Sequence, residues 1–239
     1  MNKALDRMIV ALDFSSLEEA KNFVEKMGGN VSFYKVGLEL FLNSKGEIID
    51  FLKAKNKKIF LDLKFHDIPN TVAMAGKFAS MQDVEIFNVH ASGGKKMMEE
   101  VLKIGKKQNP NSLIIAVTVL TSLGEEDVNE VFNSKFELGE LVLNLARLTK
   151  ESGLDGVVSS PWEARKIKEI CGEDFKTVCP GVRPSFASSN DQKRVMTPYE
   201  AIKNGCDYLV IGRPITRAED PILASKLIVE EIAKAMGEI

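Results

Sequence analysis

Short strand-like runs recur eight times along this chain of 239 residues, and segments with helical spacing lie between them. The runs are MIVALD (8–13), FYKVGL (33–38), KIFLDLK (58–64), EIFNVHA (85–91), SLIIAVTVL (112–120), DGVVSS (155–160), KTVCPGV (176–182) and DYLVIG (207–212). The clearest helical segments are 16–28, 45–56, 138–153 and 161–172. Strands that alternate with helices predict a parallel sheet. Eight such units in this length favour an α/β fold closed as a (β/α)8 TIM barrel, with a doubly wound open sheet as the alternative.

We expect one domain over residues 1–239, because no linker, change of composition or internal repeat divides the sequence. Two stretches lack a clear period, 121–136 and 183–198, and we interpret them as irregular loops. Loops of this length in compact domains are often functional.

Charge and composition narrow the classes of partner. The formal net charge is −2, and Lys and Arg are spread along the chain, which predicts no nucleic acid and no membrane as partner. No run approaches the roughly 20 apolar residues that span a bilayer. Three cysteines without a C-x-x-C pair favour a reducing cytoplasm. With two histidines and no His/Cys cluster, we expect no bound transition metal.

The segment IFLDLKFHDIPNT (59–71) places three charges where a strand passes into a helix. Apolar residues alternate along it with Asp62 and Lys64, so these opposite charges are expected to share one face of a strand. Asp67 follows, and Pro69 suits the first turn of a helix. Chemistry in a (β/α)8 barrel is built at the carboxyl ends of the strands, which is where this cluster is expected to lie.

Lys35 lies within an apolar strand, between Tyr34 and Val36, and an ammonium there needs a carboxylate partner. Asp62 on the adjacent strand is the natural candidate. We therefore expect a chain of alternating charges that runs Lys35, Asp62, Lys64, Asp67. Such a chain is compatible with an active site or with a structural ion network, and spacing leaves both interpretations open.

Glycine and arginine recur after the last two strands of the predicted barrel. Gly212 and Arg213 follow the eighth run, and Gly181 and Arg183 follow the seventh. Barrels of this class commonly hold phosphate with the loops after these strands. Each Gly-Arg pair alone is equally typical of an ordinary turn, but their position favours phosphate binding.

Specific motifs along nearly the whole chain resemble the orotidine 5′-phosphate decarboxylase family. They are ALD (11–13), YKVG (34–37), FLDLKFHDIPNTV (60–72), VHAS (89–92), TVLTS (118–122), PGVRP (180–184) and VIGRPIT (210–216). The Asp-x-Lys-x-x-Asp element followed by IPNT is the most specific of them.

The resemblance implies a homodimeric barrel that converts orotidine 5′-monophosphate to uridine 5′-monophosphate and carbon dioxide without metal or organic cofactor. It implies that Lys64 protonates carbon six of the pyrimidine and that Asp62 and Asp67 hold its ammonium. Lys35 is expected to link the ribose hydroxyls to Asp62, and Asp13 is expected to accept a hydrogen bond from the ribose.

The remaining contacts with substrate are also implied by the resemblance. Thr121 and Ser122 are expected at the pyrimidine, and Asp67 and Thr71 in the active site of the partner subunit. Gln192, Arg213, the backbone of Gly212 and Arg183 are expected at the phosphate, where the mobile loop 183–194 closes. Ile68 and Pro180 complete the predicted substrate contacts.

Three other functions compete with this interpretation. A 3-keto-L-gulonate 6-phosphate decarboxylase shares the Asp-x-Lys-x-x-Asp pattern but uses magnesium, and the IPNT and IGRPIT segments argue against it. A Schiff base on Lys64 requires a lowered pKa, which flanking carboxylates oppose. A non-catalytic barrel that binds uridine monophosphate is disfavoured by the intact Lys64.

Overall fold

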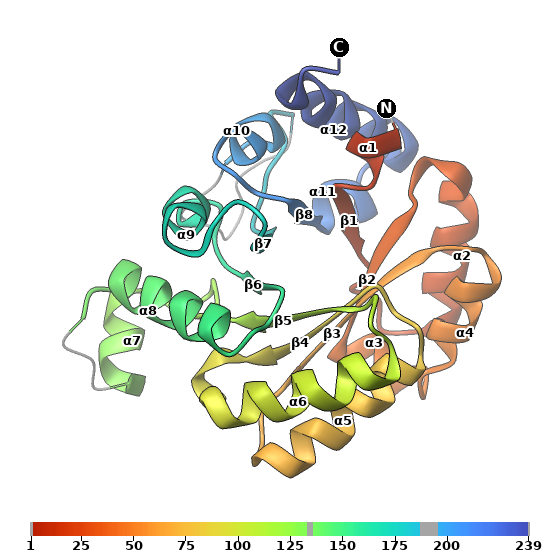
Figure 1. Cartoon of the computed structure of the whole chain (residues 1–239). Helices are drawn as coiled ribbons and strands as arrows, with labels where there is room; N and C mark the ends of the chain where they lie inside the picture. The colour runs from red at the N-terminus through yellow and green to blue at the C-terminus, as the bar shows by residue number, and fades with distance from the viewer. Residues whose placement is uncertain (1, 133–135, 187–195, 239) are drawn as a thin grey trace.

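The computed structural model describes residues 2–132, 136–186 and 196–238, and these form a closed parallel barrel wrapped by helices (Figure 1). The strands are β1 (Met8–Ala11), β2 (Phe33–Gly37), β3 (Lys58–Phe65), β4 (Ile86–His90), β5 (Leu113–Val117), β6 (Gly156–Val158), β7 (Lys176–Pro180) and β8 (Tyr208–Ile211). Each pairs in parallel with the next, and β8 pairs with β1. The predicted (β/α)8 barrel is confirmed, and the open sheet is excluded.

Helices follow the strands and cover the outside of the barrel (Figure 1). They are α1 (Asn2–Leu5), α2 (Leu17–Met27), α3 (Leu38–Asn43), α4 (Glu47–Ala54), α5 (Pro69–Met81), α6 (Lys95–Gln108), α7 (Glu125–Phe132), α8 (Leu138–Glu151), α9 (Ala164–Cys171), α10 (Pro198–Lys203), α11 (Arg213–Thr216) and α12 (Pro221–Met236). The four helices predicted from spacing are confirmed as α2, α4, α8 and α9.

The interpretation of 121–136 as irregular is wrong for its central part, which is helix α7. Acidic residues fill the first turn of α7, where they favour the positive end of the helix dipole. Among the described side chains of α7, Val128 is the one that is buried, and Val131 is 65% exposed.

The alternation of β3 sorts its side chains between two apolar layers. Phe60 belongs to the interior of the barrel, together with Ile9, Phe33, Ile115 and other strand residues. Ile59 and Leu61 belong to the layer between the strands and the helices. Asp62, one alternation step beyond Phe60, therefore lies at the carboxyl end of the barrel interior.

Two lysine–aspartate ion pairs, which we call the amino-end clamps, lie at the end of the barrel where the strands begin. In the first clamp, Nζ of Lys106 in α6 lies 2.9 Å from Oδ2 of Asp155, which stands just before β6. Its Nζ also donates to the carbonyl of Ser112 at 2.8 Å, and Asp155 accepts from the N–H of Ile114 at 2.7 Å. One clamp thus joins a helix and the starts of two strands.

The second clamp repeats the arrangement two strands further on. Nζ of Lys168 in α9 lies 2.6 Å from Oδ2 of Asp207, which stands just before β8. Its Nζ also donates to the carbonyl of Phe175 at 2.8 Å, and Asp207 accepts from the N–H of Thr177 at 2.9 Å. The second clamp thus joins α9 to the starts of β7 and β8.

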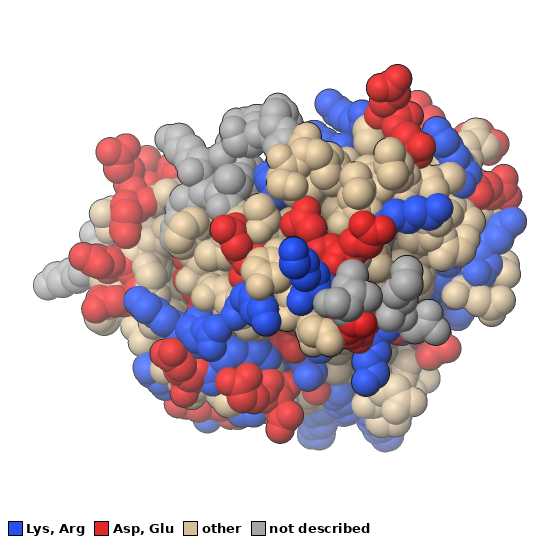
Figure 2. Space-filling model, turned by 90° about the horizontal axis from the view of Figure 1, so that it is seen from above, with Lys and Arg blue, Asp and Glu red and all other residues tan. Residues whose placement is uncertain are grey.

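Acidic and basic side chains lie interspersed on the face of the molecule that Figure 2 shows, with uncharged residues between them. This agrees with the formal net charge of −2. Among the described residues, no helix is both long enough and apolar enough to cross a membrane.

Candidate active site

Asp62 is the centre of a charge cluster at the carboxyl end of β3, and only 8% of it is exposed. Its Oδ1 lies 2.7 Å from the Nζ of Lys64, and its Oδ2 lies 3.4 Å from the Nζ of Lys35. Lys35 also pairs with Asp13 at 3.1 Å. The predicted pairing of Lys35 with Asp62 is confirmed, and Asp13 joins the same cluster.

Lys35 is held as an ammonium in spite of its burial. Burial lowers the pKa of its side chain, but the charges of Asp62 and Asp13 outweigh burial and raise that pKa above its ordinary value. Hydrogen bonds to both carboxylates act in the same direction. Lys35 therefore stays an ammonium at neutral pH.

Asp67 does not complete the predicted chain of alternating charges within this chain. In the described part of the molecule it makes no ion pair, and its Oδ1 accepts from the N–H of Ile68 at 2.7 Å. Asp67, Ile68 and Thr71 are exposed where β3 passes into α5. Within one subunit, therefore, Asp67 does not extend the chain of alternating charges beyond Lys64.

The backbone of Lys64 departs from a regular strand. Its φ is +53°, in the left-handed region that residues other than glycine rarely adopt. The register between β3 and β4 also shifts between Leu61 and Phe65, as at a β-bulge. Simple alternation along the sequence does not predict this bulge, which lies between the two charges of the cluster.

Asn88 of β4 contacts both sides of the bulge and escapes prediction from the sequence. Its Nδ2 donates to Asp62 Oδ1 at 2.7 Å, and its Oδ1 accepts from the N–H of Lys64 at 2.8 Å. Asn88 is fully buried. The signal available in the sequence is an amide in the middle of the apolar strand IFNVH, since a buried amide needs partners.

A cavity of about 170 Å³ opens at the carboxyl end of the barrel beside the charge cluster. Lys35, Asp62 and Lys64 line it on one side, and Thr121 and Pro180 line it on the other. Phe60, Val117, Val158 and Val210 form its apolar floor and walls. An apolar cavity with a few convergent charged groups is the usual form of a small-molecule site.

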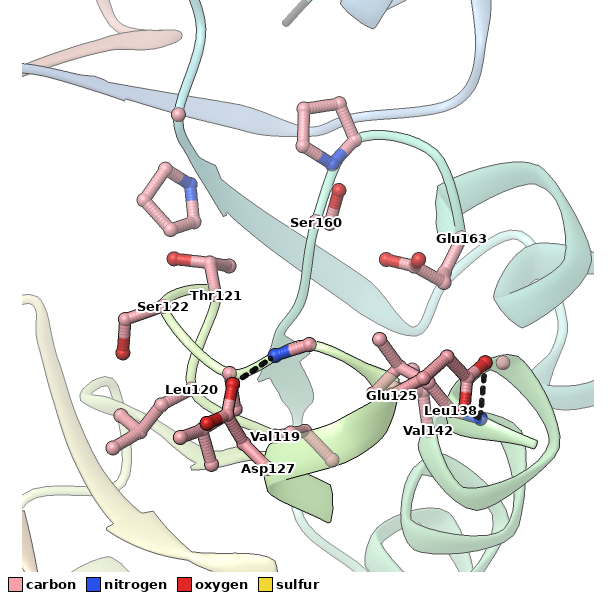
Figure 3. A pocket seen from close by; sticks show the side chains of 16 residues that line it. Val119, Leu120, Thr121, Ser122, Glu125, Asp127, Leu138, Val142, Ser160 and Glu163 are labelled. Carbon is pink, nitrogen blue, oxygen red and sulfur yellow. Dashed lines mark hydrogen bonds between the residues drawn. The ribbon is translucent and has the colours of Figure 1, made fainter. Parts of the chain in front are cut away.

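A larger cavity of about 720 Å³ adjoins the first and shares Thr121 and Pro180 with it. Figure 3 shows Thr121 and Ser122 on the loop after β5, on the opposite side of this cavity from Ser160 and Glu163. Asp127 accepts from the N–H of Gly124 at 2.8 Å, which fixes the start of α7 beside the cavity. Thr121 thus lines both cavities, and Ser122 lines the larger one.

The predicted phosphate residues lie after β7 and β8. Gly212 precedes α11, and a Cβ added there would lie 3.5 Å from Asp13 Oδ2, so Gly212 borders the charge cluster. Arg213 begins α11. Arg183 is buried, and its N–H donates to the carbonyl of Met196 at 2.9 Å. Gln192 and most of the predicted loop 183–194 lie outside the described residues.

His90 lies close to the cluster without joining its ion pairs. Its ring packs against that of His66 with 5.2 Å between the centroids. Burial, then the charges of His66 and Lys64, lower the pKa of His90 below its ordinary value. Within the described ranges, no three His, Cys, Asp or Glu side chains gather to hold a metal ion.

The family model for "Orotidine 5'-phosphate decarboxylase / HUMPS family" matches residues 6–228, which include every element of the site. The chain belongs to this family. A relative named orotidine 5'-phosphate decarboxylase from Trichlorobacter lovleyi is 47% identical over 234 residues, covering 97% of each chain. One of the same name from Nostoc is 48% identical over 233 residues, covering 95% of this chain and 97% of its own.

Solved structures agree with this membership. The crystal structure of an orotidine 5'-phosphate decarboxylase from Lactobacillus acidophilus superposes with a TM-score of 0.84 at 38% identity. The match covers 94% of this chain and 98% of that one. An uncharacterized conserved protein from Geobacillus kaustophilus superposes with a TM-score of 0.82 at 41% identity, covering 94% and 99%.

Proposed function

We propose that Lys64 delivers a proton to carbon six when this protein decarboxylates orotidine 5′-monophosphate to uridine 5′-monophosphate. The observation that carries this role is the 2.7 Å ion pair between Lys64 and Asp62 on the wall of the cavity at the barrel mouth. Family membership and full-length relatives of that name support the reaction itself.

The reaction balances with the groups of this chain alone. The bond between carbon six and the carboxylate breaks, carbon dioxide leaves, and the electron pair stays on carbon six. A proton from the Lys64 ammonium forms the new C–H bond, and the neutral amine regains a proton from water. No electron is gained or lost overall, so the step needs neither oxidant nor reductant, and we propose that it needs no metal or organic cofactor.

Fixed charge favours the carbanion-like transition state. Asp62 holds the side-chain nitrogen of Lys64 next to the position where negative charge develops, and Lys35 holds the other oxygen of Asp62. Groups that are already oriented stabilise developing charge without the cost of reorganisation. The ion pair with Asp62 argues against the Schiff-base alternative, which needs Lys64 as a free amine.

The rest of the substrate is held around this centre. Lys35 and Asp13, which form an ion pair at 3.1 Å, bind the ribose. Thr121 and Ser122 contact the pyrimidine. Pro180 lines both cavities beside Thr121. Gly212, Arg213, Arg183 and Gln192 take the phosphate. Phosphate binding far from the reacting carbon supplies energy for loop 183–194 to close and organise the site.

The active form is a homodimer that joins through an apolar face on α3 and α5. This α3–α5 apolar face comprises Leu38 (55% exposed), Leu42 (61%), Ile68 (68%), Met74 (45%), Phe78 (45%) and Met81 (57%). The rings of Phe41 and Phe78 meet edge to face at 6.2 Å between centroids, which joins the two helices. Large exposed apolar patches mark interfaces.

The same face carries residues of the predicted site. Asp67, Ile68 and Thr71 stand exposed at the start of α5, next to the α3–α5 apolar face. A second copy on this face places Asp67 and Thr71 in the neighbour's cavity, where Asp67 completes the alternating charges around Lys64. One subunit alone then holds an incomplete site.

We place the enzyme in the cytoplasm. Cys171, Cys179 and Cys206 are free and buried, as expected in a reducing compartment.

The function is tested by measuring turnover of orotidine 5′-monophosphate in the presence of a chelator, with the change in absorbance as the readout. We expect full activity with excess chelator and none after Lys64→Ala. Activity that appears only with added magnesium would contradict the proposed reaction without a metal. Tight binding of uridine monophosphate without any turnover would support the non-catalytic barrel.

A further inference from the structure

We propose that Asn88 is a positioning residue, which sets the geometry of the Asp62–Lys64 pair without touching the substrate. This positioning role rests on the proposed role of Lys64 as the proton donor. Asn88 lies in the middle of β4 and is fully buried. Asp62 and Lys64 line the cavity at the barrel mouth, whereas Asn88 is absent from the described residues that line it.

The chemistry of its partners fixes the orientation of the Asn88 amide. The N–H of Lys64 can only donate, so the Asn88 oxygen faces it, at 2.8 Å. The carboxylate of Asp62 can only accept, so the Asn88 nitrogen faces it, at 2.7 Å. Both ends of the amide are therefore used, and a flipped amide would lose both hydrogen bonds.

These two hydrogen bonds act on the two features that shape the site. The β-bulge takes the N–H of Lys64 out of the ladder between β3 and β4, and Asn88 provides its acceptor. The left-handed backbone of Lys64, with φ of +53°, persists only where its surroundings hold it. Asn88 also holds the same oxygen of Asp62 that receives the Lys64 ammonium at 2.7 Å.

The consequence is that one side chain fixes the donor, its counter-ion and the strand distortion between them. A variant without the Asn88 amide still has Lys64 and Asp62, but both side chains are free to shift relative to carbon six. A misplacement of about 1 Å can cost about 100-fold in rate. Substrate and product binding depend on other contacts and should change much less.

The first test compares Asn88→Ala with Ser112→Ala. The Ser112 hydroxyl donates to the carbonyl of Val84 and is buried near the amino end of the barrel, so its loss removes a buried hydrogen bond far from the site. Rates are divided by the concentration of sites that bind uridine 5′-monophosphate, so that unfolded protein does not count. We expect kcat of Asn88→Ala to fall by about 10- to 100-fold while KM changes by less than about 3-fold. A kcat loss no larger than that of Ser112→Ala would overturn the proposal.

The second test uses Asn88→Asp, which keeps the volume of the side chain. A protonated carboxyl group offers the same donor and acceptor as the amide, whereas an ionised one repels Asp62. Around the introduced group, Asp62 and Lys64 face it from β3, Lys35 of β2 holds the far oxygen of Asp62, and His90 lies two residues along β4. The neighbour in β5 is the apolar Ile115.

Two carboxyl groups at hydrogen-bond distance share a proton, so their joint pKa is raised, and the nearby lysines oppose only part of this rise. The kcat of Asn88→Asp, relative to that of the unaltered protein, should therefore be highest in acid and fall by about tenfold or more between about pH 5 and pH 8. A merely structural defect would not depend on pH in this way. A constant ratio across that range would overturn the proposal, even if the variant is less stable.

Discussion

Lys64 Nζ lies 2.7 Å from Asp62 Oδ1 although the two residues are two positions apart on one strand. In a regular strand such residues stand about 6.6 Å apart with parallel side chains. The β-bulge and the left-handed φ of Lys64 replace that geometry at the carboxyl end of β3. The ion pair to which we assign the proton transfer therefore lies at a local distortion of the barrel.

Asp62→Ala should lower kcat by at least about 100-fold, because it removes the fixed negative charge that orients Lys64. The substitution also lowers the pKa of Lys35, because the charge of Asp62 is the largest of the effects that raise this pKa against burial. The measurement is kcat against pH. Asp6→Asn is the control, since Asp6 pairs with Lys58 at the amino end, 2.8 Å away. Equal rates for the two variants would contradict the role of Asp62.

Mixing two inactive variants should restore activity if Asp67 serves the neighbouring subunit. In a mixed dimer of Lys64→Ala and Asp67→Ala, one site has both native residues and the other has neither. Random assortment gives about half mixed dimers, so the mixture should recover about a quarter of full activity. Recovery is measured after the variants exchange subunits, with each variant alone as the control. No recovery in verified mixed dimers would place Asp67 in its own subunit's site.

The sequence predicts most of this fold because each strand is apolar and each of the four helices in the prediction carries a broad apolar face. Helix α7 was missed although its apolar residues recur at helical spacing: its first turn is all acidic, and Val128 is the one buried residue among its described side chains. The bulge at Lys64 cannot be read from alternation, since it arises from the register between β3 and β4. Asn88 was missed for the same reason, as its partners lie on another strand.

The second amino-end clamp should contribute more stability than the first because it is more deeply buried. The side chain of Lys168 is 5% exposed, against 29% for Lys106. Lys168→Ala leaves Asp207 buried without its nearest cation and should cost about 3–5 kcal/mol of unfolding free energy. Lys106→Ala should cost about 1 kcal/mol or less. Urea unfolding measures both, and equal losses would contradict this explanation. Turnover at low temperature should be unchanged in both variants.

His90 should make stability depend on pH in mild acid. Burial, His66 and Lys64 depress its pKa in the folded state, so the unfolded chain binds the proton more readily. Its contribution is present above the unfolded pKa of about 6.5 and is lost as pH falls toward and through the folded value. We expect the difference in unfolding free energy between the unaltered protein and His90→Gln to shrink from about pH 7.5 to pH 5. Parallel curves would show that His90 does not titrate differently on folding.

The most direct test of the central claim compares Lys64→Ala with Arg213→Ala in turnover of orotidine 5′-monophosphate and in binding of uridine 5′-monophosphate. If Lys64 supplies the proton, its loss should abolish kcat and leave the product affinity within about tenfold. If Arg213 holds the phosphate, its loss should weaken product binding and raise KM, with a smaller effect on kcat. Proportional losses of kcat and product affinity in both variants would contradict the account.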